Sequence, residues 1–175
     1  GKLRKLPKGA NVEEWQRVGG AYDLFLKSEL LQNYVVTDMH STFKWLYENK
    51  EKFGEVRLSF LVQALWIGGR LPPNSNREEW QRYAGAFEFY QRNPILQIYK
   101  VRSLPETLEW LNKNRFLLGN NSLVYLMAAL IIANRLPKDV SVKTWAFSAS
   151  AYDFYLRHPI LHSYQESDLF STLKW

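Results

Sequence analysis

The sequence contains no cysteine, and it has two methionines and three histidines among 175 residues. The absence of Cys excludes a disulfide framework, a thiolate metal site and a cysteine nucleophile. It also fits a reducing compartment, so we expect an intracellular protein, cytoplasmic or nuclear. His158 and His162 stand four residues apart, but one other His and no Cys leave too few further ligands for a metal site. We therefore expect no metal and no cofactor.

Long apolar runs and catalytic motifs are also missing. The longest apolar run, Leu123 to Ala133, is shorter than the roughly 18 residues that suggest a membrane span, so it predicts a buried helix. The N-terminus is basic without a following apolar stretch, so no signal peptide is visible. The sequence has no Gly-rich phosphate loop, GxSxG or HExxH motif, and we expect that the chain is not an enzyme. A folded pocket with paired, perturbed carboxylates would argue otherwise.

The composition is that of a folded chain. Hydrophobic residues make up 46% and charged residues 23%, which is close to the usual globular mix. Aromatic residues reach 15%, and such side chains bury large areas in cores and interfaces alike. The net charge of +6 is concentrated at the N-terminus and in residues 76–140, whereas residues 11–75 have one more acid than base.

The sequence repeats itself with a period of about 65 residues, and the most similar stretches are 13–36, 78–101 and 143–166. The second half of the unit recurs as well, where Arg70-Leu71-Pro72 matches Arg135-Leu136-Pro137. These matches predict four segments: the tail of a preceding unit (1–10), repeat 1 (11–75), repeat 2 (76–140) and the first half of repeat 3 (141–175). The phase of the repeat favours a piece of a longer array. Among the aligned aromatic positions are Trp15, Trp80 and Trp145, and Tyr34, Tyr99 and Tyr164.

Each unit is predicted to form four helical segments, at about 12–28, 29–36, 38–52 and 55–69 in the first copy. The first segment is apolar on two faces, which is typical of a helix that lies between neighbours. No stretch alternates with period two for long enough to predict a strand. We therefore expect an all-α fold of tandem repeats, either solenoid-like or a compact helical array.

Local signals mark where several helices begin and end. Asp38, Ser103 and Asp168 are suited to cap the third segment of their units. Pro94 and Pro159 are suited to the first turn of the second segment. Leu-Pro follows the fourth segment, where proline ends a helix.

The recurring aromatic residues allow two interpretations. They could form a stacking platform for bases or pockets for a peptide. We favour a role in the core, because they recur at helical spacing on the faces that build the unit. Trp66 differs from the other Trp residues because its counterpart is Ile131, so it is a candidate for partner contact.

An acid stands four residues before a base in each unit, as in Asp23/Lys27, Glu88/Arg92 and Asp153/Arg157. This spacing favours an intrahelical ion pair that contributes a few tenths of a kcal/mol. Nucleic-acid phosphates are the alternative partners for the bases. Small residues also recur in the first segment, and they favour the close approach of a neighbouring helix.

The unit length and two Trp residues about 30 positions apart are similar to the helical repeats appended to some helicases. The closing Gly-aromatic-x-Trp of those repeats is absent, and Arg-Leu-Pro stands in its place. The resemblance therefore implies no function for this chain.

The sequence thus favours a non-catalytic scaffold or adaptor that binds another protein or copies of itself. An exposed apolar patch of more than a few hundred Å² would support this function. The alternative is nucleic-acid binding, which predicts affinity that falls steeply with salt. The candidate contact residues are Trp66, the N-terminal basic cluster Lys2, Arg4, Lys5 and Lys8, and the basic groups Arg77, Arg82, Lys100, Arg102, Lys113 and Arg115.

Overall fold

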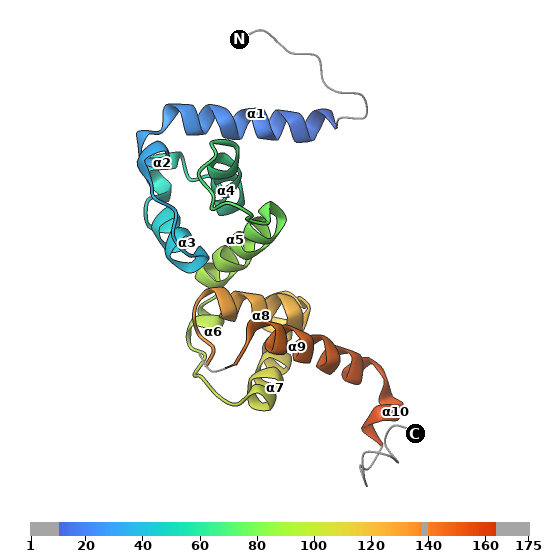
Figure 1. Ribbon diagram of the computed structural model, residues 1–175. Coiled ribbons are helices and arrows are strands. Elements are labelled where there is room, and N and C mark those ends of the chain that lie inside the picture. Colours follow the sequence, from blue (N-terminus) through green and yellow to red (C-terminus); the bar gives the residue numbers. More distant parts are fainter. Residues whose placement is uncertain (1–10, 138–139, 164–175) are drawn as a thin grey trace. The chain divides into compact units, whose positions relative to one another are not determined.

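The fold is known from a computed structural model, which describes residues 11–137 and 140–163 (Figure 1). These residues form ten α-helices and two short 3-10 helices, and no strand occurs among them. The expectation of an all-α fold is therefore confirmed.

The helices follow one another in an order that recurs along the chain, and corresponding helices begin one period of the sequence repeat apart. The 3-10 helices η1 (Lys50–Phe53) and η2 (Arg115–Leu118) have the same spacing. The α-helices are α1 (Val12–Lys27), α2 (Glu29–Asn33), α3 (Met39–Glu48), α4 (Leu58–Ile67), α5 (Arg77–Arg92), α6 (Pro94–Gln97), α7 (Leu104–Asn114), α8 (Leu123–Ile132), α9 (Val142–Arg157) and α10 (Pro159–His162).

The chain divides into two compact units, Gly1–Gln97 with Ile132–Asn134, and Ile98–Ile131 with Arg135–Trp175. In the first unit α4 packs against both α1 and α5, and α3 packs against α4 and α5 (Figure 1). Half of the residues of α4 are buried because the helix is apolar around its circumference. In the second unit α9 packs against α7.

Several helices begin at the residues that the capping and proline signals predict. The Asp38 carboxylate accepts the N–H of Ser41, and the Ser103 hydroxyl accepts the N–H of Glu106, so both predicted caps are confirmed. The helices α6 and α10 begin at the predicted prolines. The predicted cap Asp168 lies outside the described residues.

Three predicted segments are shorter in the structure, and one of them is the fourth, predicted at about 55–69 and observed as α4 at Leu58–Ile67. Helix α3 ends at Glu48, and the chain continues into η1, which Gly54 closes with a left-handed backbone at φ 80°. The Trp45 carbonyl oxygen accepts both the backbone N–H and the side-chain amide of Asn49. Helix α2 ends at Asn33, where the backbone becomes extended.

Close packing explains one glycine and part of the small-residue pattern. A Cβ atom at Gly68 would lie 2.5 Å from the Phe25 ring, so the ring leaves no room for a side chain there. Ala21 is fully buried, whereas a Cβ atom at Gly19 would meet nothing within 4 Å. The predicted close approach of a neighbouring helix therefore holds for Ala21 and not for Gly19.

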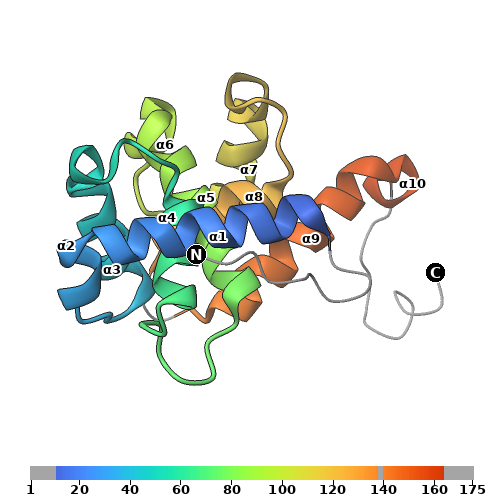
Figure 2. The same ribbon diagram turned by 90° about the horizontal axis from the view of Figure 1, so that it is seen from above.

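The first helix differs most from its expected environment. We expected α1 to lie between neighbours, but Ala21 is its one buried residue. Helix α4 covers one side of α1, and no helix among the described residues of the first unit covers the opposite side (Figures 1 and 2). Helix α5, by contrast, buries four residues because α3 and α4 both pack against it.

Within the described residues, no single helix is long and apolar enough to cross a membrane. One sharply bent pair, Leu104–Leu118 with Leu123–Ile132, meets the criteria of length and composition alone. The apolar run that begins at Leu123 forms α8, in which residues 126–130 are buried, as the sequence predicts.

Candidate functional site

Two of the recurring acids connect consecutive helices through residues that stand 30 positions apart. The Glu88 carboxylate accepts the backbone N–H of Leu58, the first residue of α4, at 2.7 Å. No side chain of the residue preceding α4 caps this end, so Glu88 supplies the acceptor from 30 residues further along the chain. In the second unit the Asp153 carboxylate accepts the N–H of Leu123, the first residue of α8, at 3.0 Å.

These contacts change the interpretation of the acid–base spacing. Glu88 also pairs with Arg92 at 3.0 Å, as the spacing predicts. Asp153 pairs instead with Arg115 on η2, and the Arg157 guanidinium donates to the backbone oxygen of Asp153. Glu88 and Asp153 therefore each join their helix to the preceding one, which the i,i+4 spacing does not reveal because it reports only neighbours on the same helix.

A second set of contacts recurs in both units. The Arg70 guanidinium donates to the carbonyl oxygen of Tyr34 at 2.6 Å, and Arg135 donates in the same way to Tyr99. The Tyr34 hydroxyl lies 3.3 Å from the hydroxyl oxygen of Thr42, and Tyr99 bonds to the equivalent Thr107. Thr42 and Thr107 are fully buried, so these bonds satisfy hydroxyl groups that would otherwise destabilise the core.

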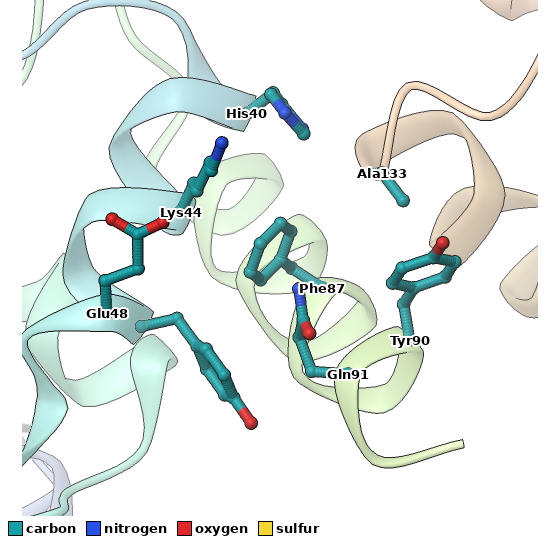
Figure 3. Close-up of a pocket in the computed structure, with 8 residues that line it drawn as sticks. His40, Lys44, Glu48, Phe87, Tyr90, Gln91 and Ala133 are labelled. Atoms are coloured by element: carbon teal, nitrogen blue, oxygen red, sulfur yellow. The ribbon is translucent and has the colours of Figure 1, made fainter. Parts of the chain in front are cut away.

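The first unit contains a pocket of about 370 Å³ between α3 and α5 (Figure 3). His40, Lys44 and Glu48 approach it from α3, and Phe87, Tyr90 and Gln91 from α5. The His40 Nδ1 atom lies 2.7 Å from the carbonyl oxygen of Ile132. Because a carbonyl oxygen can only accept, Nδ1 carries the hydrogen. Ala133, the residue that directly follows α8, lines the same pocket.

The second unit contains a larger and more apolar groove, which we call the α7/α9 groove. It has a volume of about 530 Å³. Phe147, on its α9 side, is 77% exposed. Its lining residues are Leu104, Pro105, Leu108 and Glu109 from α7, and Phe147, Ser148, Ala151, Tyr152 and Tyr155 from α9.

The two cavities occupy equivalent positions in the sequence. Lys44 and Tyr90 of the Figure 3 pocket stand one repeat period before Glu109 and Tyr155 of the α7/α9 groove. They differ in one lining contribution and in exposure. Ala133 lines the first cavity, whereas Ala151, the counterpart of the buried Ala86, is exposed in the lining of the second.

Trp66 lines a third pocket, of about 350 Å³, in the first unit. The pocket lies between α1 and α4, and Trp15 forms part of its α1 side. The Arg77 guanidinium lies 4.4 Å from the centre of the Trp66 ring and 3.9 Å from the Glu14 carboxylate. Trp66 is 36% exposed, so its surface is shared between the Arg77 contact and solvent.

The other basic candidates fall into two groups. Lys113 pairs with Glu109 at 3.2 Å, and Arg115 is half-buried against Asp153. Arg82, Lys100 and Arg102 are exposed and have no ion pair among the described residues. Lys2, Arg4, Lys5 and Lys8 lie outside the described residues.

The two neighbouring histidines have structural partners. His158 bonds to the carbonyl oxygen of Phe154 at 2.8 Å, and His162 to that of Tyr155 at 2.7 Å. The described part of the chain brings together no group of three or more His, Cys, Asp or Glu side chains that could hold a metal ion.

Comparison with family models, with curated proteins and with solved structures finds no match for this chain.

Proposed function

We propose that this chain is a non-catalytic scaffold of tandem helical repeats that binds another protein through the α7/α9 groove. The repeats are residues 11–75 and 76–140 and the first half of a third, 141–175. They belong to a longer array in which each unit packs against the next.

Three observations support the repeat. Corresponding helices begin one repeat period apart, as α1 does at Val12 and α5 at Arg77. The bonds from Glu88 to Leu58 and from Asp153 to Leu123 join equivalent positions, and so do the bonds from Arg70 and Arg135 to the tyrosine carbonyls. Polar contacts with strict geometric requirements rarely coincide in this way unless the surrounding backbone follows the same path.

The open α7/α9 groove is the observation that carries the binding function. Its lining contains the exposed ring of Phe147 and the rings of Tyr152 and Tyr155, and aromatic side chains are enriched where proteins bind one another. The Figure 3 pocket indicates what such a groove accepts, because Ala133, the residue that directly follows the apolar helix α8, lines it. The partner of the α7/α9 groove is therefore an apolar helix end on another protein.

Nucleic acid is the less favoured partner. Arg77, Lys113 and Arg115 each have an acidic neighbour within 4 Å, which reduces the positive charge that a phosphate would meet. Arg82, Lys100 and Arg102 remain as candidates for phosphate contacts. Binding that loses several orders of magnitude in affinity between low and moderate salt would favour this function over ours.

A photocrosslinking amino acid at position 147 tests the proposal in an extract of the source cells. We expect a discrete protein product whose crosslinked peptide is an apolar helical segment of the partner. The matched control carries the same group at Lys143, one turn earlier on α9, exposed and outside the lining of the groove. A second variant, Ala151→Arg, places a charged side chain in the groove at an exposed position and should abolish the product.

Two results would contradict the proposal. Equal crosslinking from positions 147 and 143 would show that the groove has no specific partner. A crosslinked product that is digested by nuclease would show that the chain binds nucleic acid instead.

A further inference from the structure

Helix α1 carries an exposed apolar stripe next to the face that packs on α4, and Trp15 in this stripe also lines the pocket that contains Trp66. Its members are spaced alternately by three and four residues, so they lie along one face of the helix. Trp15 is 46% exposed and Tyr22 is 45% exposed. The α1 stripe consists of Val12, Trp15, Gly19, Tyr22 and Leu26.

The same three central positions are buried in α5. Trp80 and Phe87, which correspond to Trp15 and Tyr22, are 5% and 2% exposed, and Ala84 is fully buried. The Trp80 ring meets Phe43 of α3 edge-on, with centroids 5.6 Å apart. Phe87 contacts Phe43 as well, at 6.0 Å. The surface that covers this face of α5 is thus the helix pair α3–α4.

Helix α9 repeats the arrangement in the second unit. Trp145 is 1% exposed, and Ala149 is fully buried. The helix packs against α7, the counterpart of α3. Among the three equivalent helices, α5 buries all three central positions and α9 buries two, since Tyr152 is half-buried and lines the α7/α9 groove. Helix α1 buries none of them.

The recurring acid provides an independent, polar observation. Glu88 on α5 accepts the first N–H of the preceding helix, α4. Asp153 on α9 accepts the first N–H of α8 in the same way. Asp23 is the equivalent residue of α1. Its side chain is exposed and has no hydrogen-bond or ion-pair partner within residues 11–137 and 140–163. The Asp23 carboxylate can therefore accept the N–H of a helix N-terminus, which is where a carboxylate stabilises a helix.

We infer that the α1 stripe is the docking face for a helix pair of the α3–α4 type, supplied by a further repeat of the same kind. An aromatic side chain equivalent to Phe43 would cover Trp15 and Tyr22. The N-terminus of the pair's second helix would donate to Asp23. A second copy of this chain in the fold described does not supply the pair, because α5 already covers α3 and α4. The inference rests on the repeat in the proposed function.

The test inserts a second copy of residues 36–75 between Ala10 and Asn11 of the whole chain. The new junction, Ser75 to Asn11, reproduces the native step from Ser75 to Asn76, and both Asn residues cap the helix that follows. Hydrogen exchange is measured at the amides of α1. We expect exchange to slow by about 5- to 30-fold, the factor that one or two kcal/mol of added packing gives.

Two matched variants make the outcome specific. Phe43→Asp in the inserted copy alone should remove the protection of α1. Asp23→Ala should speed exchange at the N-terminus of the inserted second helix, and it should have no such effect at Leu58 of the native α4.

Unchanged exchange in α1, or protection that survives Phe43→Asp, would overturn the inference. So would a dimer of the unmodified chain that Trp15→Ala dissociates in sedimentation velocity, because the stripe would then belong to a second copy. None of these results alters the crosslinking expected at position 147, so failure of this inference is distinguishable from failure of the binding function.

Discussion

Replacement of Glu88 by alanine tests whether the recurring acid joins two helices or pairs within one. The sequence spacing alone predicts an intrahelical pair with Arg92, so that Glu88→Ala and Arg92→Ala would destabilise the protein by similar, small amounts. The structure predicts unequal effects, because Glu88 also accepts the N–H of Leu58 whereas Arg92 has no second acidic partner in the described chain.

The magnitude follows from the two contacts. A hydrogen bond to a charged group contributes about 1.5–3 kcal/mol, and the Glu88 side chain is 12% exposed, so solvent screens it little. The Arg92 side chain is 67% exposed, and a surface pair of this spacing contributes about 0.3–0.5 kcal/mol. We therefore expect the free energy of unfolding to fall by about 2 kcal/mol for Glu88→Ala and by less than about 0.5 kcal/mol for Arg92→Ala.

Urea unfolding followed by far-UV circular dichroism measures the two losses, and hydrogen exchange at the first turn of α4 locates them. Asp23→Ala is the matched control at the equivalent position of α1, where the described chain offers the acid no partner; it should stay within about 0.5 kcal/mol of the parent. Equal effects of Glu88→Ala and Arg92→Ala, or unchanged exchange at Leu58, would refute the reasoning.

Three further predictions concern packing and pH. Trp80→Ala should lower the free energy of unfolding by about 3–5 kcal/mol, and Trp15→Ala clearly less, since Trp15 is 46% exposed; denaturant titration of both variants checks this. Gly68→Ala should destabilise by about 1–3 kcal/mol because its Cβ atom would overlap the Phe25 ring, and restored stability in a double variant with Phe25→Ala would identify the overlap as the cause. Hydrogen bonds from Ser41 hold the pKa of Asp38 below its ordinary value, so its contribution is complete above the unfolded-state pKa of about 4 and is lost as pH falls through the lower folded-state pKa. Thermal melts across this acidic range should show a weaker pH dependence for Asp38→Asn than for the parent.

Local features of the fold follow well from the sequence. The caps at Asp38 and Ser103 and the helix start at Pro94 depend on residues within one turn of the feature that they determine. The apolar character of α4 and α8 likewise predicts their burial. Signals of this kind need no knowledge of which distant segments meet.

Features that depend on distant partners could not be predicted in the same way. The bond from Glu88 to Leu58 spans 30 residues, and the sequence shows the acid without showing its partner. Trp15 and Trp80 stand in nearly identical sequence, yet the second is covered by α3 and α4 and the first has no such cover. Exposure is a property of the neighbouring helices, so a repeat in sequence does not by itself imply equal burial.

The central proposal is that one helical unit recurs along the chain, with its first helix packed on the third and fourth helices before it as α5 packs on α3 and α4. An experimental structure, with residues 77–132 superposed on 12–67, tests it most directly. We predict that each pair of corresponding helices coincides and that Leu58 and Leu123 donate to Glu88 and Asp153. A different backbone path through the two segments, or acids turned away from both helix ends, would contradict it.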